Sequence, residues 1–129
     1  MIRGIGVDVC EISRMDSMNI DSRFVERFFS EEERTYLRNR GVGFRQSLAG
    51  MYAAKEAFAK TLGSGVRGFE LRDVEILHSA EGQPYYSISG SALKAQQERR
   101  IERVFLSISH DAGIAVAFAV GWGKEPDEE

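Results

Sequence analysis

A long helix is predicted by residues 44–62, FRQSLAGMYAAKEAFAKTL, with Gly63 placed to end it. Alanines occupy much of this stretch, so little of the helix surface is left to face water. The large apolar side chains recur at helical spacing and form one stripe: Phe44, Leu48, Met51, Phe58 and Leu62. The pattern therefore predicts a central helix that is packed on several sides.

Strands are predicted before and after this helix, because apolar side chains there recur at every second position. One strand covers residues 2–9, and two hairpins join residues 74–79 to 84–90 and residues 104–110 to 114–120. In the last strand both alternating sets are apolar or small. We therefore expect both of its faces to be covered, by other subunits as well as by the chain's own helices.

Shorter helices are predicted in the remaining segments. Residues 11–20 and 22–29 have helical patterns, with Asp21 as the candidate cap of the second. Residues 30–33, SEEE, form a capping-box pattern that starts another short helix. A charged surface helix is expected at residues 91–103.

Length and composition limit the fold. With 129 residues and 43% apolar content, the chain fits one domain, which we place at residues 1–123, followed by an acidic, disordered tail at residues 124–129. The order of elements predicts an α+β fold with a mainly antiparallel sheet packed on the central helix. A domain of this size has little room for a cleft of its own, so another copy is expected to supply a second wall.

Charge, cysteine content and hydropathy narrow the environment and the partners. A formal net charge of -3 and a pI of about 5.5 argue against nucleic acid as the main partner. The single cysteine, Cys10, excludes an intramolecular disulfide and suits a reducing compartment. No apolar run reaches the length of a membrane span and residues 1–4 lack a signal-peptide pattern, so we expect a soluble cytoplasmic protein without a membrane partner.

Asp8 and Glu56 are the candidate metal ligands. Asp8 shares a strand face with Gly4 and Gly6, which leave room for a neighbouring element, although it could instead cap the next helix. Glu56 shares a helix face with small residues and with Lys60, and an ordinary Glu–Lys pair on a wet face is the alternative. A carboxylate on a face poor in water needs a partner. A hard cation shared with Asp8 would supply one, with waters and phosphate oxygens as its other ligands.

Three further polar features each allow two interpretations. Lys55 lies inside the apolar stripe, where it could extend to an edge or reach an anionic ligand beside the metal. Gly63 and Ser64 follow the long helix and could form only its end or a contact to a bound cofactor. His110, in the sequence SISHD at residues 107–111, could be structural, could contact phosphate or could transfer a proton.

Three blocks of the sequence occur in the order and spacing of one known pattern. They are GIGVDV at residues 4–9, AAKEAFAK at residues 53–60 and SISHD at residues 107–111, with GQP at residues 82–84 between the last two. Together they resemble the holo-acyl-carrier-protein synthase family of 4'-phosphopantetheinyl transferases. The resemblance extends over essentially the whole predicted domain.

This resemblance implies transfer of 4'-phosphopantetheine from coenzyme A to a serine of apo-acyl carrier protein, in fatty acid biosynthesis, with Mg2+ as cofactor and adenosine 3',5'-bisphosphate as product. It also implies a homotrimer with active sites between subunits. Asp8 and Glu56 match the family's metal ligands, Lys60 matches a lysine beside the pyrophosphate, and His110 matches a coenzyme A contact. Glu56, Lys60 and His110 are thus the candidate catalytic residues. The proton acceptor stays open between a metal-bound water, Glu56 and His110 with Asp111.

The resemblance also marks a docking face and one departure. Four residues match a face that docks the acidic helix of the carrier: Arg14, Arg23, Phe24 and Arg27. Met51 stands where the family often has an arginine, and Tyr52 follows where the family has Phe or Trp. Arg45 is a candidate to replace that arginine, and it joins Lys60, Gly63, Ser64 and His110 as an expected coenzyme A contact.

Two other functions are considered. The same chemistry could act on the carrier domain of a polyketide or peptide synthetase, since the motifs do not separate these carriers. A non-catalytic module that only docks carrier protein is the second. Its weakness is that such a module has no need for four polar groups in a packed site, Asp8, Glu56, Lys60 and His110.

Overall fold

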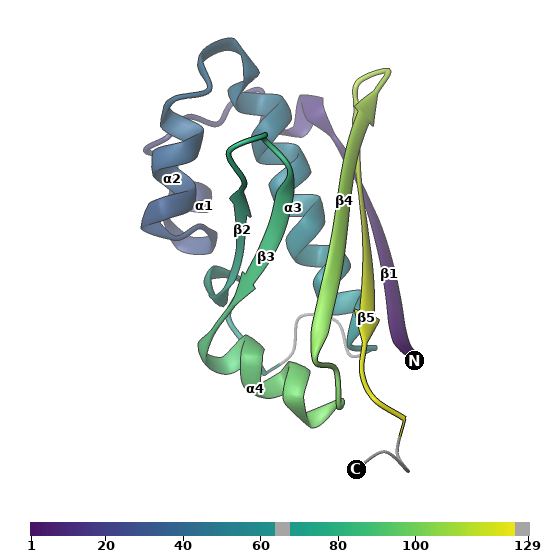
Figure 1. The fold of residues 1–129 in the computed structure, drawn as a ribbon. Helices are drawn as coiled ribbons and strands as arrows, with labels where there is room; N and C mark the ends of the chain where they lie inside the picture. The colour runs from purple at the N-terminus through teal and green to yellow at the C-terminus, as the bar shows by residue number, and fades with distance from the viewer. Residues whose placement is uncertain (64–67, 126–129) are drawn as a thin grey trace.

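The computed structural model describes residues 1–63 and 68–125. Its main elements, in chain order, are β1 (Ile2–Glu11), α1 (Arg23–Phe28), α2 (Glu31–Arg38), α3 (Phe44–Thr61), β2 (Val74–His78), β3 (Pro84–Ile88), α4 (Gly90–Glu98), β4 (Arg103–Asp111) and β5 (Ile114–Trp122). Figure 1 shows α3 along the three-stranded sheet β1-β5-β4, with the β2-β3 hairpin and helices α1 and α2 on its other side. All paired strands are antiparallel. The predicted α+β class and the central helix are confirmed, although the strands form two sheets.

Strand β1 packs directly on the backbone of α3. A Cβ atom added at Gly4 would overlap the carbonyl oxygen of Thr61, and one added at Gly6 would overlap that of Ala57. Only glycine permits this approach, as the alternating pattern predicted. The contact fixes the next residue on the same strand face, Asp8, beside the C-terminal half of α3.

The three-stranded sheet is covered on one face only within the chain. Ala115, Ala117 and Ala119 of β5 are buried on the side of α3. The other face exposes large apolar side chains: Ile5, Val7, Val9, Phe105, Ile114, Phe118 and Trp122. We expected both faces of β5 to be covered. The chain itself covers the face toward α3, and none of the described residues covers the other face.

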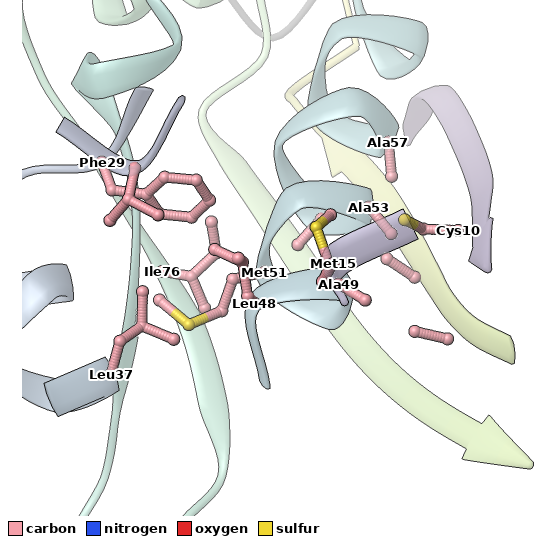
Figure 2. Close-up of a cluster of buried hydrophobic side chains, with 14 of the residues drawn as sticks. Cys10, Met15, Phe29, Leu37, Leu48, Ala49, Met51, Ala53, Ala57 and Ile76 are labelled. Atoms are coloured by element: carbon pink, nitrogen blue, oxygen red, sulfur yellow. The ribbon is translucent and has the colours of Figure 1, made fainter. Parts of the chain in front are cut away.

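Two groups of core side chains meet opposite sides of α3. In Figure 2, Phe29, Leu37, Leu48, Met51 and Ile76 gather on one side, toward α2 and β2. The figure shows the alanines on the other side, near Cys10 and Met15: Ala49, Ala53 and Ala57. Small residues face the sheet closely, whereas large ones fill the wider space toward the helices. This confirms the prediction of a helix packed on several sides.

Lys55 follows neither interpretation from the sequence. Its side chain is 0% exposed, and its Nζ donates to Glu33 Oε1 at 2.8 Å and to the carbonyls of Leu71 and Val74 at 2.9 and 2.7 Å. Glu33 in turn accepts from the backbone N–H of Ile76 at 3.0 Å. The ammonium thus neither reaches an edge nor points toward a ligand. It joins α3 to α2 and to the start of β2, because three acceptors satisfy it inside the core.

Helix starts were predicted well where a local motif determines them. The capping box of α2 is present, with Glu33 N–H donating to Ser30 Oγ at 3.3 Å and Ser30 N–H donating to Glu33 Oε1 at 2.9 Å. At α1, however, Ser22 rather than Asp21 is the N-cap, and its side chain makes no capping bond. Its hydroxyl accepts from the N–H of Asn19 instead, so a local turn competes with the cap.

Two predicted helices are shorter than expected. Residues 11–20 contain only one 3-10 turn, Ile12–Met15, because Ile12 N–H donates to Gly113 O and holds the chain at the end of the sheet. Helix α4 ends at Glu98, and two residues later Arg100 adopts a left-handed φ of 59°, a conformation typical of helix ends.

The expected tail lies partly outside the described residues, which end at residue 125. Lys124 N–H donates to Glu102 Oε2 at 2.9 Å, so the start of that segment is bonded to the domain. Among the described residues, no helix has the length and apolarity to cross a membrane.

Candidate active site

Asp8 and Lys60 meet where β1 packs on α3. Lys60 Nζ lies 3.0 Å from Asp8 Oδ1 and donates to the carbonyl of Val7 at 2.9 Å. The side chain of Lys60 is 54% exposed and that of Asp8 is 19% exposed. Asp8 therefore binds an ammonium rather than capping the following turn, whose N-cap, Glu11, has no side-chain capping bond. The pair remains open to solvent and to an incoming ligand.

Glu56 reaches the same place from α3, one turn before Lys60. Its side chain is half-buried and forms a hydrogen bond with Tyr52. Burial, this hydrogen bond and the charge of Glu56 raise the pKa of Tyr52 to about 12, so its phenol remains a donor at neutral pH. Asp8 also contributes to raising the pKa of Tyr52, while Arg14 opposes it. The charges of both candidate carboxylates therefore act on the same phenol.

Two carboxylates at one centre fit a hard divalent cation. The described residues contain no group of three or more His, Cys, Asp or Glu side chains that could hold a metal alone. Mg2+ keeps several waters and often takes only one or two protein carboxylates together with substrate phosphates. Asp8 and Glu56 therefore match the donor set of a magnesium–phosphate site. The alternative of an ordinary Glu56–Lys60 pair is wrong, since Lys60 pairs with Asp8.

His110 belongs to a different part of the chain's surface. Its Nε2 lies 2.8 Å from Gln46 Nε2, and both residues line a cavity of about 180 Å3 at the N-terminal half of α3. Asp8 pairs with Ala117 on β5, and His110 lies on the next strand, β4, roughly 10 Å across the sheet. A single chain therefore does not bring His110 to the carboxylates.

The other expected coenzyme A contacts are also dispersed. Arg45 Nη1 lies 3.8 Å from Asp16 Oδ1, and Arg45 lines a separate cavity of about 550 Å3. Gly63 has a φ of 78°, and its N–H donates to the carbonyl of Lys60, so it ends α3 as predicted. Ser64 lies outside the described residues.

Arginines and phenylalanines of α1 form the expected basic face. Arg23, Phe24 and Arg27 line a cavity of about 450 Å3 together with Arg72, which sequence reasoning missed. Arg72 donates to the carbonyl of Glu26, a contact between segments far apart in sequence that no motif marks. The whole lining is Arg23, Phe24, Glu26, Arg27, Phe28 and Arg72.

This basic face is continuous with the carboxylate site. The rings of Phe24 and Tyr52 pack edge to face with centroids 5.0 Å apart, and the guanidinium of Arg14 lies 6.0 Å from the Tyr52 ring centroid. Sequence reasoning also missed the role of the Tyr52 hydroxyl. The spacing of Tyr52 and Glu56, four residues apart on a helix, was the signal that could have found it.

Comparison with known proteins identifies the family. Residues 4–119 match the family model described as the 4'-phosphopantetheinyl transferase superfamily. The chain belongs to this superfamily. A Treponema denticola protein named holo-[acyl-carrier-protein] synthase is 38% identical over 120 residues, covering 93% of this chain and 98% of its own length. A Halothermothrix orenii protein of the same name is 40% identical over 124 residues, covering 94% and 98%.

Solved structures of this superfamily share the fold. The holo-[acyl-carrier-protein] synthase of Neisseria meningitidis matches with a TM-score of 0.85 and 35% identity, over 95% of this chain and 99% of that one. The Bacillus anthracis enzyme, solved in complex with CoA (3',5'-ADP), matches with a TM-score of 0.79 and 33% identity, over 96% and 99%. The family predicted from three sequence blocks is confirmed.

Proposed function

We propose that this transferase moves the 4'-phosphopantetheine arm of coenzyme A onto a serine of apo-acyl carrier protein, in the cytoplasm and for fatty acid biosynthesis, with Mg2+ held by Asp8 and Glu56. One observation carries the proposal. The packing of β1 on α3 brings a carboxylate from each element and the ammonium of Lys60 to one solvent-open place. With a divalent cation bound, such a set suits the diphosphate of coenzyme A.

In this reaction the serine hydroxyl attacks the phosphorus that carries pantetheine, and the bond from that phosphorus to the bridging oxygen of the diphosphate breaks. Adenosine 3',5'-bisphosphate leaves with the bridging oxygen, and the serine proton passes to a base. A bound Mg2+ supplies charge stabilisation to this phosphoryl transfer. Lys60 adds a positive charge beside the departing oxygen. Tyr52 orients Glu56 through its hydrogen bond.

The working unit is proposed to be a homotrimer. The exposed apolar face of the sheet is larger than isolated surface residues explain, and it requires cover. His110 lies away from Asp8 within one chain, so the site is complete only if the cavity beside His110 faces the carboxylates of a second copy. A trimer would satisfy both requirements at once.

The carrier is proposed to dock on the basic face formed by Arg14, Arg23, Phe24 and Arg27, to which Arg72 is added. Arginines attract an acidic helix, while Phe24 offers an apolar anchor. This face leads to Tyr52 and therefore to Glu56, so a docked carrier would have its serine near the diphosphate. The carrier could come from fatty acid synthesis or from a polyketide or peptide synthetase. Modification rates measured on a panel of apo-carriers would show which one the protein prefers.

The deciding experiment is incubation of the protein with coenzyme A, Mg2+ and apo-acyl carrier protein, read by mass spectrometry of the carrier. We expect a mass gain of one phosphopantetheine, which is lost with a chelator and in Asp8→Asn or Glu56→Gln. The matched control is Glu98→Gln, an exposed carboxylate of α4, which should retain activity. A carrier that stays unmodified by the wild-type protein, while still binding to it, would support the non-catalytic docking module instead.

A further inference from the structure

Arg14 lies apart from the other arginines that are expected to dock the carrier. The cavity on α1 is lined by Arg23, Arg27 and Arg72, and Arg14 is not one of its lining residues. Arg14 is exposed, and among the described residues no carboxylate lies within ion-pair distance of its guanidinium. Its charge is therefore available to an anion that binds nearby.

The guanidinium of Arg14 is turned back toward the strand face that carries Asp8. Arg14 belongs to the 3-10 turn that follows β1, and the next residue, Met15, anchors this turn in the core. Figure 2 shows Met15 and Cys10 together beside α3. Burial raises the pKa of the Cys10 thiol, and Arg14 opposes this rise through its charge and a hydrogen bond. Cys10 follows Asp8 on the same face of β1, about 7 Å further along the strand.

Arg14 also approaches the second carboxylate, through Tyr52. The guanidinium carbon of Arg14 lies 6.0 Å from the centroid of the Tyr52 ring, and the Tyr52 hydroxyl is bonded to Glu56. Each carboxylate thus has a neighbour that Arg14 contacts: Cys10 beside Asp8, and Tyr52 beside Glu56. The guanidinium is therefore within reach of a ligand bound by the two carboxylates.

Arg14 and Lys60 lie at opposite ends of the candidate site. Along α3, Tyr52 lies one turn before Glu56 and Lys60 lies one turn after it, so these two neighbours are about 12 Å apart along the helix axis. Along β1, Lys60 contacts the residue before Asp8, whereas Arg14 contacts the one two positions after it. Both elements thus give the same order, with the carboxylates between the two cations.

The docking face meets the site at the Arg14 end. Phe24 packs against the Tyr52 ring with centroids 5.0 Å apart, and Tyr52 is also the neighbour of Arg14. A carrier docked on α1 would therefore present its serine from this end. In-line displacement requires the serine and the leaving group to lie on opposite sides of the phosphorus under attack. The leaving group then departs toward Lys60.

We propose that Arg14, besides any contact with the carrier, binds the phosphate group of coenzyme A that is transferred, so that this phosphate lies toward Arg14 and the adenosine phosphate lies toward Lys60. The inference rests on the proposed function, because it names a further contact to the same substrate. Arg14 donates to the nonbridging oxygens of the transferred phosphate and exchanges no proton. The serine oxygen bonds to that phosphorus while the bridging oxygen leaves with the nucleotide. A guanidinium suits this position because it is always charged and its fork of N–H groups matches a phosphate.

The test is calorimetric titration with Mg2+ and without carrier, using coenzyme A and adenosine 3',5'-bisphosphate, which lacks the transferred phosphate. In Arg14→Gln we expect coenzyme A binding to weaken about tenfold and bisphosphate binding to stay within about twofold. Arg14→Lys, which retains the charge but loses the fork, should lose less. Lys60→Met should weaken both ligands to a similar extent. Arg23→Gln is the matched control from the docking face and should bind both ligands as the wild type does, because no carrier is present.

Each outcome separates this inference from the proposed function. Unchanged coenzyme A binding in Arg14→Gln would mean that Arg14 only docks the carrier. Equal weakening of both ligands would mean that Arg14 acts on the nucleotide or on the fold, whereas retained bisphosphate binding shows that the variant is folded. Either of the first two results overturns the inference and leaves phosphopantetheine transfer intact. If the wild-type protein neither binds coenzyme A nor modifies the carrier, the proposed function itself fails.

Discussion

Lys55 and Lys60 lie little more than one turn apart on α3, and each meets one carboxylate. Lys55 Nζ is 2.8 Å from Glu33, with both side chains 0% exposed, whereas Lys60 Nζ is 3.0 Å from Asp8, with the lysine 54% exposed. The distances are nearly equal, but the surroundings differ. Three acceptors saturate Lys55 inside the core, and Lys60 remains accessible to a ligand. Burial, rather than ion pairing, therefore separates a structural lysine from a candidate catalytic one.

Burial also shifts the pKa values of the Lys55–Glu33 pair. Burial lowers the pKa of Lys55 and raises that of Glu33, although each partner opposes the shift of the other. Desolvation thus exceeds attraction in this pair, as is common for buried ion pairs. The pair therefore contributes to the position of α2 and β2 against α3.

The largest expected effect is on stability, from Lys55→Met. The free energy of unfolding should fall by about 3–5 kcal/mol, because Glu33 and two backbone carbonyls lose their partner inside the core. Lys60→Met should change it by less than about 1 kcal/mol, since that pair is exposed. Denaturant unfolding of both variants measures the difference. Similar losses in the two variants would contradict the division by burial.

Lys60→Met tests the other half of the comparison. We expect kcat for carrier modification to fall about 100-fold, because a charge beside the leaving oxygen is lost, with a smaller change in KM for coenzyme A. Lys94→Met, an exposed lysine of α4, is the matched control and should retain kcat. If only KM changes in Lys60→Met, the lysine binds coenzyme A without assisting departure of the leaving group.

The contrast between the two lysines also shows which contacts could be predicted from the sequence and which could not. The pattern of Gly4, Gly6 and Asp8 predicted the approach of β1 to α3, because alternation and glycine content are local properties. The buried contacts of Lys55 could not be predicted. Its partners, on α2 and at the start of β2, are distant in sequence, and no periodic signal connects them.

The cavity beside His110 could not be predicted for the same reason. Arg40 follows α2, His78 ends β2 and His110 ends β4, and only the folded chain brings them together. Sequence reasoning selected Arg45 because it lies on the same helix as Met51, but its side chain contacts Asp16. The approach of β1 to α3 was marked by glycines in the sequence, whereas no local pattern marks the contacts of Lys55.

A smaller effect is expected from Tyr52→Phe, which introduces a residue type that the family has at this position. Removing the hydrogen bond to Glu56 should weaken Mg2+ binding about tenfold, as loss of a supporting contact to a metal ligand commonly does. Stability should change little, since the ring and its contact with Phe24 remain. Binding of Mn2+ as a probe ion, followed by paramagnetic resonance, measures the affinity without turnover. Unchanged affinity would show that Glu56 is oriented by its helix alone.

The smallest effect concerns pH and His78. Burial, and secondly the charge of Arg40, lower the pKa of His78 below its ordinary value of about 6.5. Between the lowered pKa and the ordinary one, the unfolded chain binds more protons than the folded chain, so stability falls as the pH decreases through this window. His78→Gln cannot take up the proton, and its unfolding free energy should therefore decline less than that of the wild type.

The difference in slope should be below about 1 kcal/mol over the window, which denaturant unfolding at several pH values between 7.5 and 5 can resolve. Arg40→Gln should reduce the wild-type slope by a smaller amount than His78→Gln, because it removes the secondary cause and leaves the burial. Glu31 and Glu32 of the neighbouring cavity are present in all three proteins, so their contributions cancel in the comparison. Parallel stability curves for the wild type and His78→Gln would mean that His78 has the same pKa in the folded and unfolded protein, and would contradict the effect of burial on this imidazole.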